Sequence, residues 1–456
     1  MIKKSLVMGF TTGVLMLIGL VVQHFLAKYL TLDEYGVYVL MFSWIGLLSV
    51  FSLNSFNTIV TKASAQNYPR FFKTASKVCF LFSLLSSIAL LIIGFFFEPE
   101  RLNLFIVLAI FFPFYGGINL ADSYFIGASK FNKYSIYMIT SQCIIAGLQI
   151  LSVVFLHGIF WLLFFTLLGT SVINLVMTFF IYRGIKQEKD YKKEQELTKY
   201  GIQLTGVGIF SSIASRIQYV LLASLAGTAT LAIYAVAQLI PEKIKGLIKG
   251  VLNPPSMHLA SQKKEESIYL MRKLILPLLL FGIGVGLLVS LFLPIIINLV
   301  FGQKYHEAII YSLVLLVPVI FIPINAMFSS IIIYHDYKRF YTKITIITNI
   351  LQIILFIVLI PLFQIWGVIL AIVGLAVINT LLNLVWFYRL PIYPNKKTIL
   401  TMRKGLKVKG YETIYFDEKL NGENILKVIG ADYLFCKEKY PIWTRIIGKL
   451  SNIKNI

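Results

Sequence analysis

Long apolar runs separated by short polar stretches make up most of this sequence as far as about residue 390. A helix that crosses a lipid bilayer needs about 20 mostly apolar residues. Twelve runs meet this requirement, at residues 6–27, 36–60, 78–97, 102–126, 134–156, 158–182, 202–225, 230–256, 273–299, 308–333, 342–361 and 366–389. We therefore predict an all-α membrane protein with twelve transmembrane helices.

The composition of the chain argues against a soluble fold. Hydrophobic residues make up 58% of it and charged residues only 14%, against about 45–50% and about 25% in soluble domains. Such a chain would expose large apolar patches if it folded in water. The first run follows Lys3 and Lys4 and lacks a small-residue cleavage site, so we expect a retained helix and not a signal peptide.

The net charge of +22 could indicate a nucleic-acid partner, but its distribution favours a membrane topology. Lys and Arg gather in loops that stay in the cytoplasm. With the N-terminus inside and the helices alternating, the external turns hold only Lys28, Arg101 and Lys304. The internal loops hold Lys62, Arg70, Lys73, Lys77, Lys130, Lys133, Arg183, Lys186, Lys189, Lys192, Lys193, Lys199, Lys263, Lys264, Arg272, Lys273, Lys338, Arg339 and Lys343. We therefore expect both termini in the cytoplasm and no nucleic-acid partner.

An internal repeat divides the apolar part of the chain. A shift of about 196 residues aligns Ala27 with Ala223, Gly36 with Ala232, Tyr38 with Tyr234 and Asn57 with Asn253. Six helices followed by six, each set starting on the same side, would form parallel repeats with a substrate path between them near the bilayer midplane. We expect an N-terminal lobe with its cytoplasmic linker at 1–199 and a C-terminal lobe at 200–390.

Residues 391–456 differ from the rest because they are polar, basic and rich in turn residues. Strand-like stretches at 411–416 and 432–436 flank a possible helix at 422–429. This cytoplasmic tail is either a small αβ appendage or a segment that lies on the membrane surface. It contains no catalytic motif, and its role is not indicated by the sequence.

Charged residues inside the apolar runs are the strongest functional signal, because each costs about 2.5–3.5 kcal/mol at the centre of a membrane helix. Arg216 lies about 21 Å along the run that begins at residue 202, at 1.5 Å per residue. Glu242, Lys245 and Lys249 form one stripe by their i, i+3 and i+7 spacing. A basic stripe in a water-filled cleft suits a diphosphate, whose oxygens accept charge-assisted hydrogen bonds.

Arg216 and the stripe of charges could each have a purely structural role. Arg216 could extend towards the interface or pair structurally, and Pro241 could break its helix so that the stripe lies along the inner membrane surface.

Amide side chains supply the other candidates for substrate binding. They can bond sugar hydroxyls, or they can hold helices together. The expected binding set is Arg216, Glu242, Lys245, Lys249, Asn57, Gln142, Gln149 and Asn253. Further amides that share helix faces are Gln23, Asn54, Asn349, Gln352, Asn379 and Asn383.

Three segments resemble polysaccharide-biosynthesis transporters, a family that includes the O-antigen and capsule flippases of the multidrug/oligosaccharidyl-lipid/polysaccharide (MOP) exporter superfamily. They are KYLTLDEYGVYVL (28–40), IYAVAQLIPEKIKGLIKGVLNPP (233–255) and LVFGQKYHEAI (299–309). The resemblance covers about residues 1–390. It implies a V-shaped, MATE-like fold that moves an undecaprenyl-diphosphate-linked oligosaccharide across the bacterial cytoplasmic membrane by alternating access. It also implies membrane lipid, glycosyltransferases and a glycan polymerase as partners.

Other classes remain open at this point. A small-molecule exporter coupled to H⁺ or Na⁺ usually needs a buried carboxylate, and the only acids within the runs are Glu242 and, near a helix end, Asp122. A peptidoglycan-precursor flippase would typically carry fourteen helices. A glycan polymerase or ligase needs a large external loop, and the external loops here are short. We expect no catalytic residue. We also expect no metal or other cofactor, since Cys79, Cys143 and Cys436 lie far apart and no Cys/His cluster exists.

Overall fold

The structure is a computed structural model that describes residues 2–185, 190–262, 264–335 and 338–389. The expected tail at 391–456 therefore lies outside the described residues. Met1–Gln262 and Leu270–Arg389 belong to one compact unit, and Lys263–Tyr269 belong to a second.

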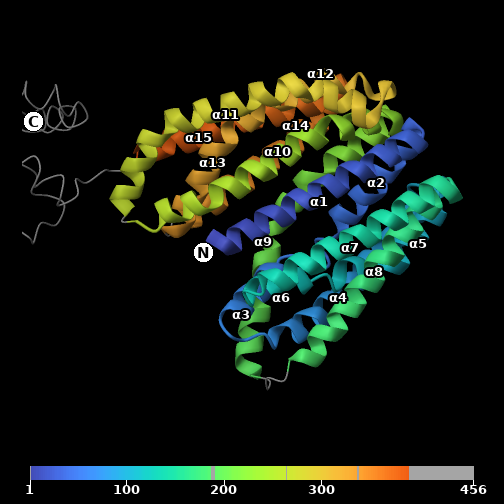
Figure 1. The fold of residues 1–456 in the computed structure, drawn as a ribbon, viewed down its shortest axis with the longest axis horizontal. Helices are drawn as coiled ribbons and strands as arrows, with labels where there is room; N and C mark the ends of the chain where they lie inside the picture. Colours follow the sequence, from blue (N-terminus) through green and yellow to red (C-terminus); the bar gives the residue numbers. More distant parts are fainter. Residues whose placement is uncertain (1, 186–189, 263, 336–337, 390–456) are drawn as a thin grey trace, which may run out of the picture. The chain divides into compact units, whose positions relative to one another are not determined.

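The described residues are helical or lie in short connections (Figure 1). The N-terminal half contains α1 (Ile2–Tyr29), α2 (Leu32–Leu48), α3 (Phe56–Ala65), α4 (Phe71–Phe96), the short η1 (Pro99–Arg101), α5 (Leu102–Phe112), the π-helical η2 (Pro113–Gly117), α6 (Ala121–Gly127), α7 (Phe131–Leu151), the π-helical η3 (Ser152–Leu156) and α8 (Ile159–Gly184). The C-terminal half contains α9 (Tyr191–Ala226), α10 (Thr228–Ala260), α11 (Lys264–Phe301), the short η4 (Gln303–Tyr305), α12 (Ala308–Leu315), α13 (Val317–Tyr334), α14 (Lys338–Phe363) and α15 (Ile365–Arg389).

Within the described part of the chain, 10 helical segments are long and apolar enough to cross a membrane. The other two expected spans do not meet that criterion. Residues 36–60 fall on α2 and α3, which are separate helices, and residues 230–256 fall within α10, which carries several charges. The multi-pass all-α class is confirmed, while the count of twelve stays a prediction.

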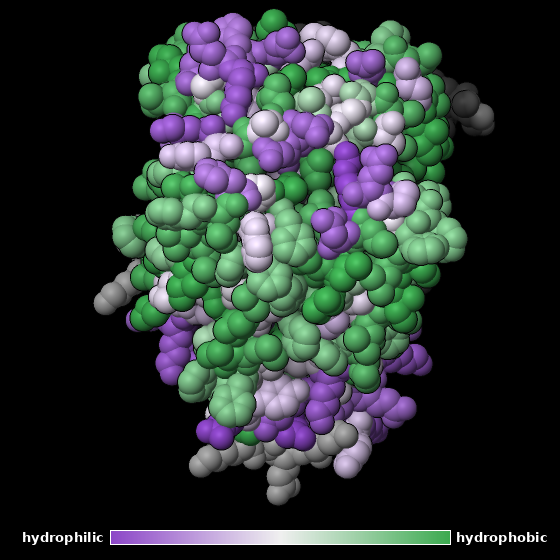
Figure 2. Space-filling model, turned by 90° about the vertical axis from the view of Figure 1, so that its right-hand side faces the viewer, coloured by the Kyte–Doolittle hydropathy of each residue, from purple (hydrophilic) through white to green (hydrophobic). Residues whose placement is uncertain are grey.

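The helices carry many large apolar side chains on their outer faces. Phe96, Phe97, Leu291 and Leu299 are each at least 70% exposed, and hydrophobic side chains cover much of the face in Figure 2. Soluble proteins rarely expose so much apolar surface, whereas a helix that faces the hydrocarbon of a bilayer carries apolar side chains on its outside. These faces therefore fit a lipid environment.

Three of the expected spans are broken within their length. Between α2 and α3, Ser49 Oγ donates to Gly46 O and Ser52 Oγ donates to Ser49 O, both at 2.7 Å. Such side-chain bonds compete with the helical ladder. Pro113 ends α5, since its ring lacks an N–H and crowds the preceding turn, and the third break lies between α12 and α13 before Pro318. Irregular backbone at membrane depth occurs where it is buried in protein or lines a wet cavity.

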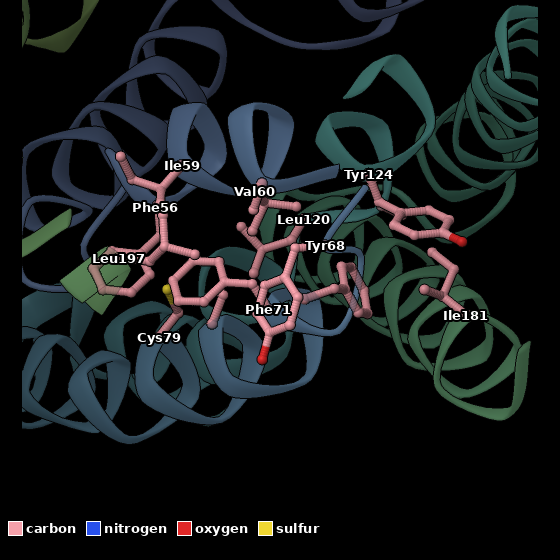
Figure 3. Packing of buried hydrophobic residues seen from close by; sticks show 14 of the residues in the cluster. Phe56, Ile59, Val60, Tyr68, Phe71, Cys79, Leu120, Tyr124, Ile181 and Leu197 are labelled. Carbon is pink, nitrogen blue, oxygen red and sulfur yellow. The ribbon is translucent and has the colours of Figure 1, made fainter. Parts of the chain in front are cut away.

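One buried core fixes the start of α9 to the N-terminal half. Phe56, Phe71 and Leu197 lie in a cluster built from α3, α4, α6, α8 and α9 (Figure 3). Gly201 lets α9 approach closely, because a Cβ there would lie 2.6 Å from the Phe56 ring. The predicted boundary near residue 199 thus falls on a helix that contacts both halves.

Beside this core, Glu194 is buried and holds the same end of α9 in place. Its carboxylate accepts a hydrogen bond from Thr74 Oγ1 at 2.6 Å and one from Tyr68 Oη at 3.2 Å, and it lies 3.8 Å from Arg70 Nε. Burial raises the pKa of the Tyr68 phenol, which favours its neutral, donating form.

The two halves also meet where α1 turns into α2. Gly36 lies directly against the Thr228 carbonyl, and the Thr228 hydroxyl donates to Asp33. Lys304 Nζ donates to Leu30 O at 2.7 Å. Burial lowers the pKa of Lys304, and nearby Glu34 partly opposes this shift. We call this group the α1–α2 junction.

Candidate functional site

A cavity of about 340 Å³ lies beside two of the helix breaks, and we call it the arginine cavity. Ser49 and Asn54 come from the break after α2, and Tyr115 and Asn119 come from η2 and the turn after it. Broken backbone therefore lines a cavity here, as expected for irregular structure at membrane depth.

Arg216 of α9 enters this cavity from the C-terminal half of the sequence. Gly46 makes the approach possible, because a Cβ on that residue would lie 2.7 Å from Arg216 Nε. Arg216 is exposed to the cavity and forms no ion pair with any described residue. An arginine in this position presents donors for which the described residues supply no acceptor, which suits an anionic ligand.

Two amide side chains that line the arginine cavity already form hydrogen bonds within the protein. Asn54 Nδ2 donates to Ser49 Oγ at 2.7 Å, and Asn57 Oδ1 accepts from Ser123 Oγ at 3.0 Å. These bonds orient both side chains. The remaining amide atoms, with Asn119, can bond a polar ligand beside the guanidinium.

A second cavity of about 360 Å³ contains three charged residues of α10, and we call it the lysine cavity. Glu242, Lys245 and Lys249 line one side, and Pro318 in the first turn of α13, just after the break, lies on another. Lys245 Nζ and Glu242 Oε1 are 3.1 Å apart, with side chains 40% and 50% exposed. An ion pair as exposed as this one contributes little to the stability of the fold.

Lys249 lies one turn further along α10 and forms no ion pair with the residues that the structure describes. Helix α10 runs without a break from Thr228 to Ala260, so Pro241 does not end it. This agrees with the single-stripe interpretation and not with a broken helix.

A third cavity of about 220 Å³, the asparagine cavity, is lined by residues of α13, α14 and α15. It shares Asn325, Ser329, Thr348, Asn349 and Asn379 with the lysine cavity, so the two adjoin.

The sequence-predicted site residues thus separate into groups. The structure brings Glu242, Lys245 and Lys249 together but places Arg216 in a different cavity, with Asn57. Gln149 is buried and donates to Tyr38 Oη at 3.1 Å, which is a helix-to-helix contact.

Two predicted amides contribute nothing to the described sites. Gln142 lines none of these three cavities in the described part of the chain. The Asn253 side chain lies outside the described residues.

Sequence reasoning missed Asn119, Tyr115 and Asn325. The signal for the first two was the Pro-Phe-Tyr-Gly-Gly stretch at 113–117, whose proline and glycines mark a helix break. Asn325 is a single amide in an apolar run and gave no such signal.

No group of three His, Cys, Asp or Glu side chains suited to a metal ion occurs among the described residues. Besides apolar side chains, the three cavities are lined by Lys and Arg cations, amides, hydroxyls and one acid, Glu242. These groups can bind and release a polar, anionic ligand through hydrogen bonds and charge.

Comparison with known proteins gives one family and one fold. The family model described as polysaccharide biosynthesis protein matches residues 25–310, more than half of the chain. No curated protein matches the sequence.

Several solved structures share the fold. The lipid II flippase MurJ in an inward closed conformation has a TM-score of 0.60 at 18% identity, and the match covers 91% of this chain and 94% of that one. An outward-facing multidrug resistance MATE family transporter of the MOP superfamily has a TM-score of 0.59 at 14% identity, covering 85% and 94%.

A MOP superfamily transporter from Pyrococcus furiosus, for which reverse polarity of the binding pocket suggests a different function, has a TM-score of 0.55 at 14% identity, covering 85% and 95%. These likenesses confirm the MOP fold expected from the three sequence segments.

Proposed function

Because the chain belongs to the polysaccharide biosynthesis protein family and has the fold of MOP superfamily transporters, we propose that it is a lipid-linked saccharide flippase. It moves a polyprenyl-diphosphate-linked oligosaccharide from the inner to the outer leaflet of the bacterial cytoplasmic membrane. One observation carries this proposal: two cavities at helix breaks each present a cation, Arg216 or Lys249, that has no carboxylate partner among the described residues.

A diphosphate supplies the negatively charged hydrogen-bond acceptors that Arg216 and Lys249 lack among the described residues. Its oxygens only accept hydrogen bonds, and a guanidinium can bind two of them at once. Glu242 holds Lys245 at 3.1 Å, so the empty lysine cavity is not purely cationic. Arg216 in the arginine cavity, and Lys245 and Lys249 in the lysine cavity, bind the anionic head at successive positions along the path, while the amides of each cavity bond the saccharide.

Translocation is a non-covalent cycle in this proposal, with no bond made or broken in the substrate. The α1–α2 junction lies at the outer side of the membrane and closes the path to that side. Opening requires the Lys304–Leu30 and Thr228–Asp33 hydrogen bonds to break. Both termini lie in the cytoplasm, where glycosyltransferases supply the substrate. A glycan polymerase takes it from the other side.

The alternative is a cation-coupled exporter of small molecules, for which the MATE family matches and Glu242 are the supporting observations. That mechanism requires Glu242 to bind and release the coupling cation. The Lys245 ammonium beside it competes for the same carboxylate.

The test compares Arg216→Ala and Lys249→Ala with Arg183→Ala and Lys343→Ala, which remove the same charges outside the described cavities. Each charged hydrogen bond contributes about 1.5–3 kcal/mol, so each cavity variant should bind undecaprenyl diphosphate about ten- to a hundredfold more weakly. The controls should bind it normally. Unchanged binding in both cavity variants would refute the proposed head-group site.

A further inference from the structure

The asparagine cavity adjoins the lysine cavity but differs from it in chemistry. Its lining is Asn325, Ser329, Ile332, Ile344, Thr345, Thr348, Asn349, Asn379 and Asn383. No charged side chain of the described residues lines it. We propose that this cavity is a sugar subsite, which binds one uncharged sugar ring of the saccharide whose diphosphate lies at Lys249. This inference rests on the proposed function and deepens it.

Two contacts within the protein fix the amides that form the cavity. Asn349 Nδ2 donates to Ser211 Oγ at 2.6 Å, and Asn325 Nδ2 donates to Thr380 Oγ1 at 2.9 Å. Asn383 Nδ2 lies 3.4 Å from both Asn325 Oδ1 and Asn379 Oδ1, which are long, weak contacts. The amides are therefore oriented before any ligand arrives, which lowers the entropic cost of binding.

Several polar atoms stay available after these contacts are made. Asn349 Oδ1, Asn379 Nδ2 and the Thr345 hydroxyl have no hydrogen-bond partner among the described residues. All three residues line the cavity and are only partly buried. The cavity thus presents an acceptor, a donor and a group that can do both.

This mixture favours a hydroxyl-bearing ligand over an ion. A phosphate needs donors only, and a metal cation needs several oxygen ligands, usually with a carboxylate among them. A sugar hydroxyl donates and accepts, so it can satisfy amide oxygen and amide nitrogen together. At about 220 Å³ the cavity is smaller than the roughly 300–1,000 Å³ of pockets for whole small molecules, which suits one ring and not a chain.

The asparagine cavity lies next to the lysine cavity, so one ligand can place its sugar in the first and its diphosphate in the second. Asn349 and Asn379 line both cavities, so a ligand can lie across the shared wall with its diphosphate at Lys249 and its first sugar among the asparagines. The lysines would then bind every polyprenyl diphosphate alike. The asparagine cavity would decide which sugar is accepted.

The test measures binding to the full chain in lipid nanodiscs. The probes are undecaprenyl diphosphate and the same lipid carrying glucose, galactose, N-acetylglucosamine or N-acetylgalactosamine. The variants are Thr345→Val, which is close in shape, and Asn383→Ala; both residues line the asparagine cavity and not the lysine cavity. Asn298→Ala is the control, because Asn298 lines none of the three described cavities.

We expect wild type to bind at least one sugar-bearing lipid about tenfold or more tightly than the bare lipid. Each variant should reduce that preference by about two- to tenfold and leave binding of the bare lipid unchanged. Equal wild-type affinity for bare and sugar-bearing lipids would overturn the sugar subsite while leaving the flippase proposal intact. Equal loss of bare-lipid binding in both variants would also overturn it, and failure of wild type to bind any of these lipids would refute both proposals.

Discussion

Replacing Gly46 with alanine should impair transport without removing any charge. The new Cβ would lie 2.7 Å from Arg216 Nε and 3.1 Å from its Cδ, so the arginine side chain has to move out of its place in the arginine cavity. Loss of one charged hydrogen bond to the substrate corresponds to about 1.5–3 kcal/mol, or about ten- to a hundredfold in affinity.

The stability of the folded protein should rise in Gly46→Ala, even though its affinity for the substrate falls. Gly46 lies within α2, and alanine is favoured over glycine in a helix by about 0.8–1.0 kcal/mol. The assay measures both quantities on the same purified protein: affinity for undecaprenyl diphosphate, and the apparent melting temperature in detergent. Gly206→Ala on α9 is the control, because nothing lies within 4 Å of a Cβ built there. Wild-type affinity in Gly46→Ala would refute the role given to Arg216, and so would a loss of affinity accompanied by a lower melting temperature.

In a cysteine-free background, Asp190→Cys should react with a membrane-impermeant thiol reagent only after cells are opened, and labelling in intact cells would reverse the proposed topology. Glu242→Gln should still support glycan export, because the proposed cycle uses no carboxylate as a proton carrier; a variant that binds substrate but no longer responds to a pH gradient would favour the exporter. Glu194→Ala should lower the apparent melting temperature, since it removes the acceptor of Thr74 Oγ1 and leaves Tyr68 Oη only its longer bond to Asp190 O at 3.4 Å, and each hydrogen bond lost costs about 0.5–1.5 kcal/mol; an unchanged melting temperature would show that this contact does not hold α9.

The helices could be predicted from the sequence because hydrocarbon imposes a length and a composition on each of them. Pro113 marks a position where the helical ladder cannot continue, so the break after α5 is one that a sequence can indicate. The break at residues 49–55 was not expected. Its serines and asparagine are scattered among apolar residues, and their effect depends on which backbone carbonyls the hydroxyls reach.

The site was only partly predictable. Lys245 and Lys249 share one face of one helix, so their spacing alone brings them together in the lysine cavity. Arg216 lies on a different helix, and its cavity depends on how closely α9 passes α2 at Gly46. Periodicity describes faces within a helix and contains no information about which helices cross. The same limit applies to Gln149, whose partner Tyr38 is 111 positions away.

We propose above that this protein moves a polyprenyl-diphosphate-linked saccharide between leaflets. The most direct measurement reconstitutes it in liposomes that contain undecaprenyl-diphosphate-N-acetylglucosamine, or the lipid preferred in the binding panel, and follows the appearance of sugar on the opposite leaflet. We predict rapid translocation by wild type and by the Arg183→Ala, Lys343→Ala double variant, and a rate near that of empty liposomes for the Arg216→Ala, Lys249→Ala double variant. Translocation no faster with wild type than in empty liposomes, or equally fast with the cavity double variant, would contradict the account.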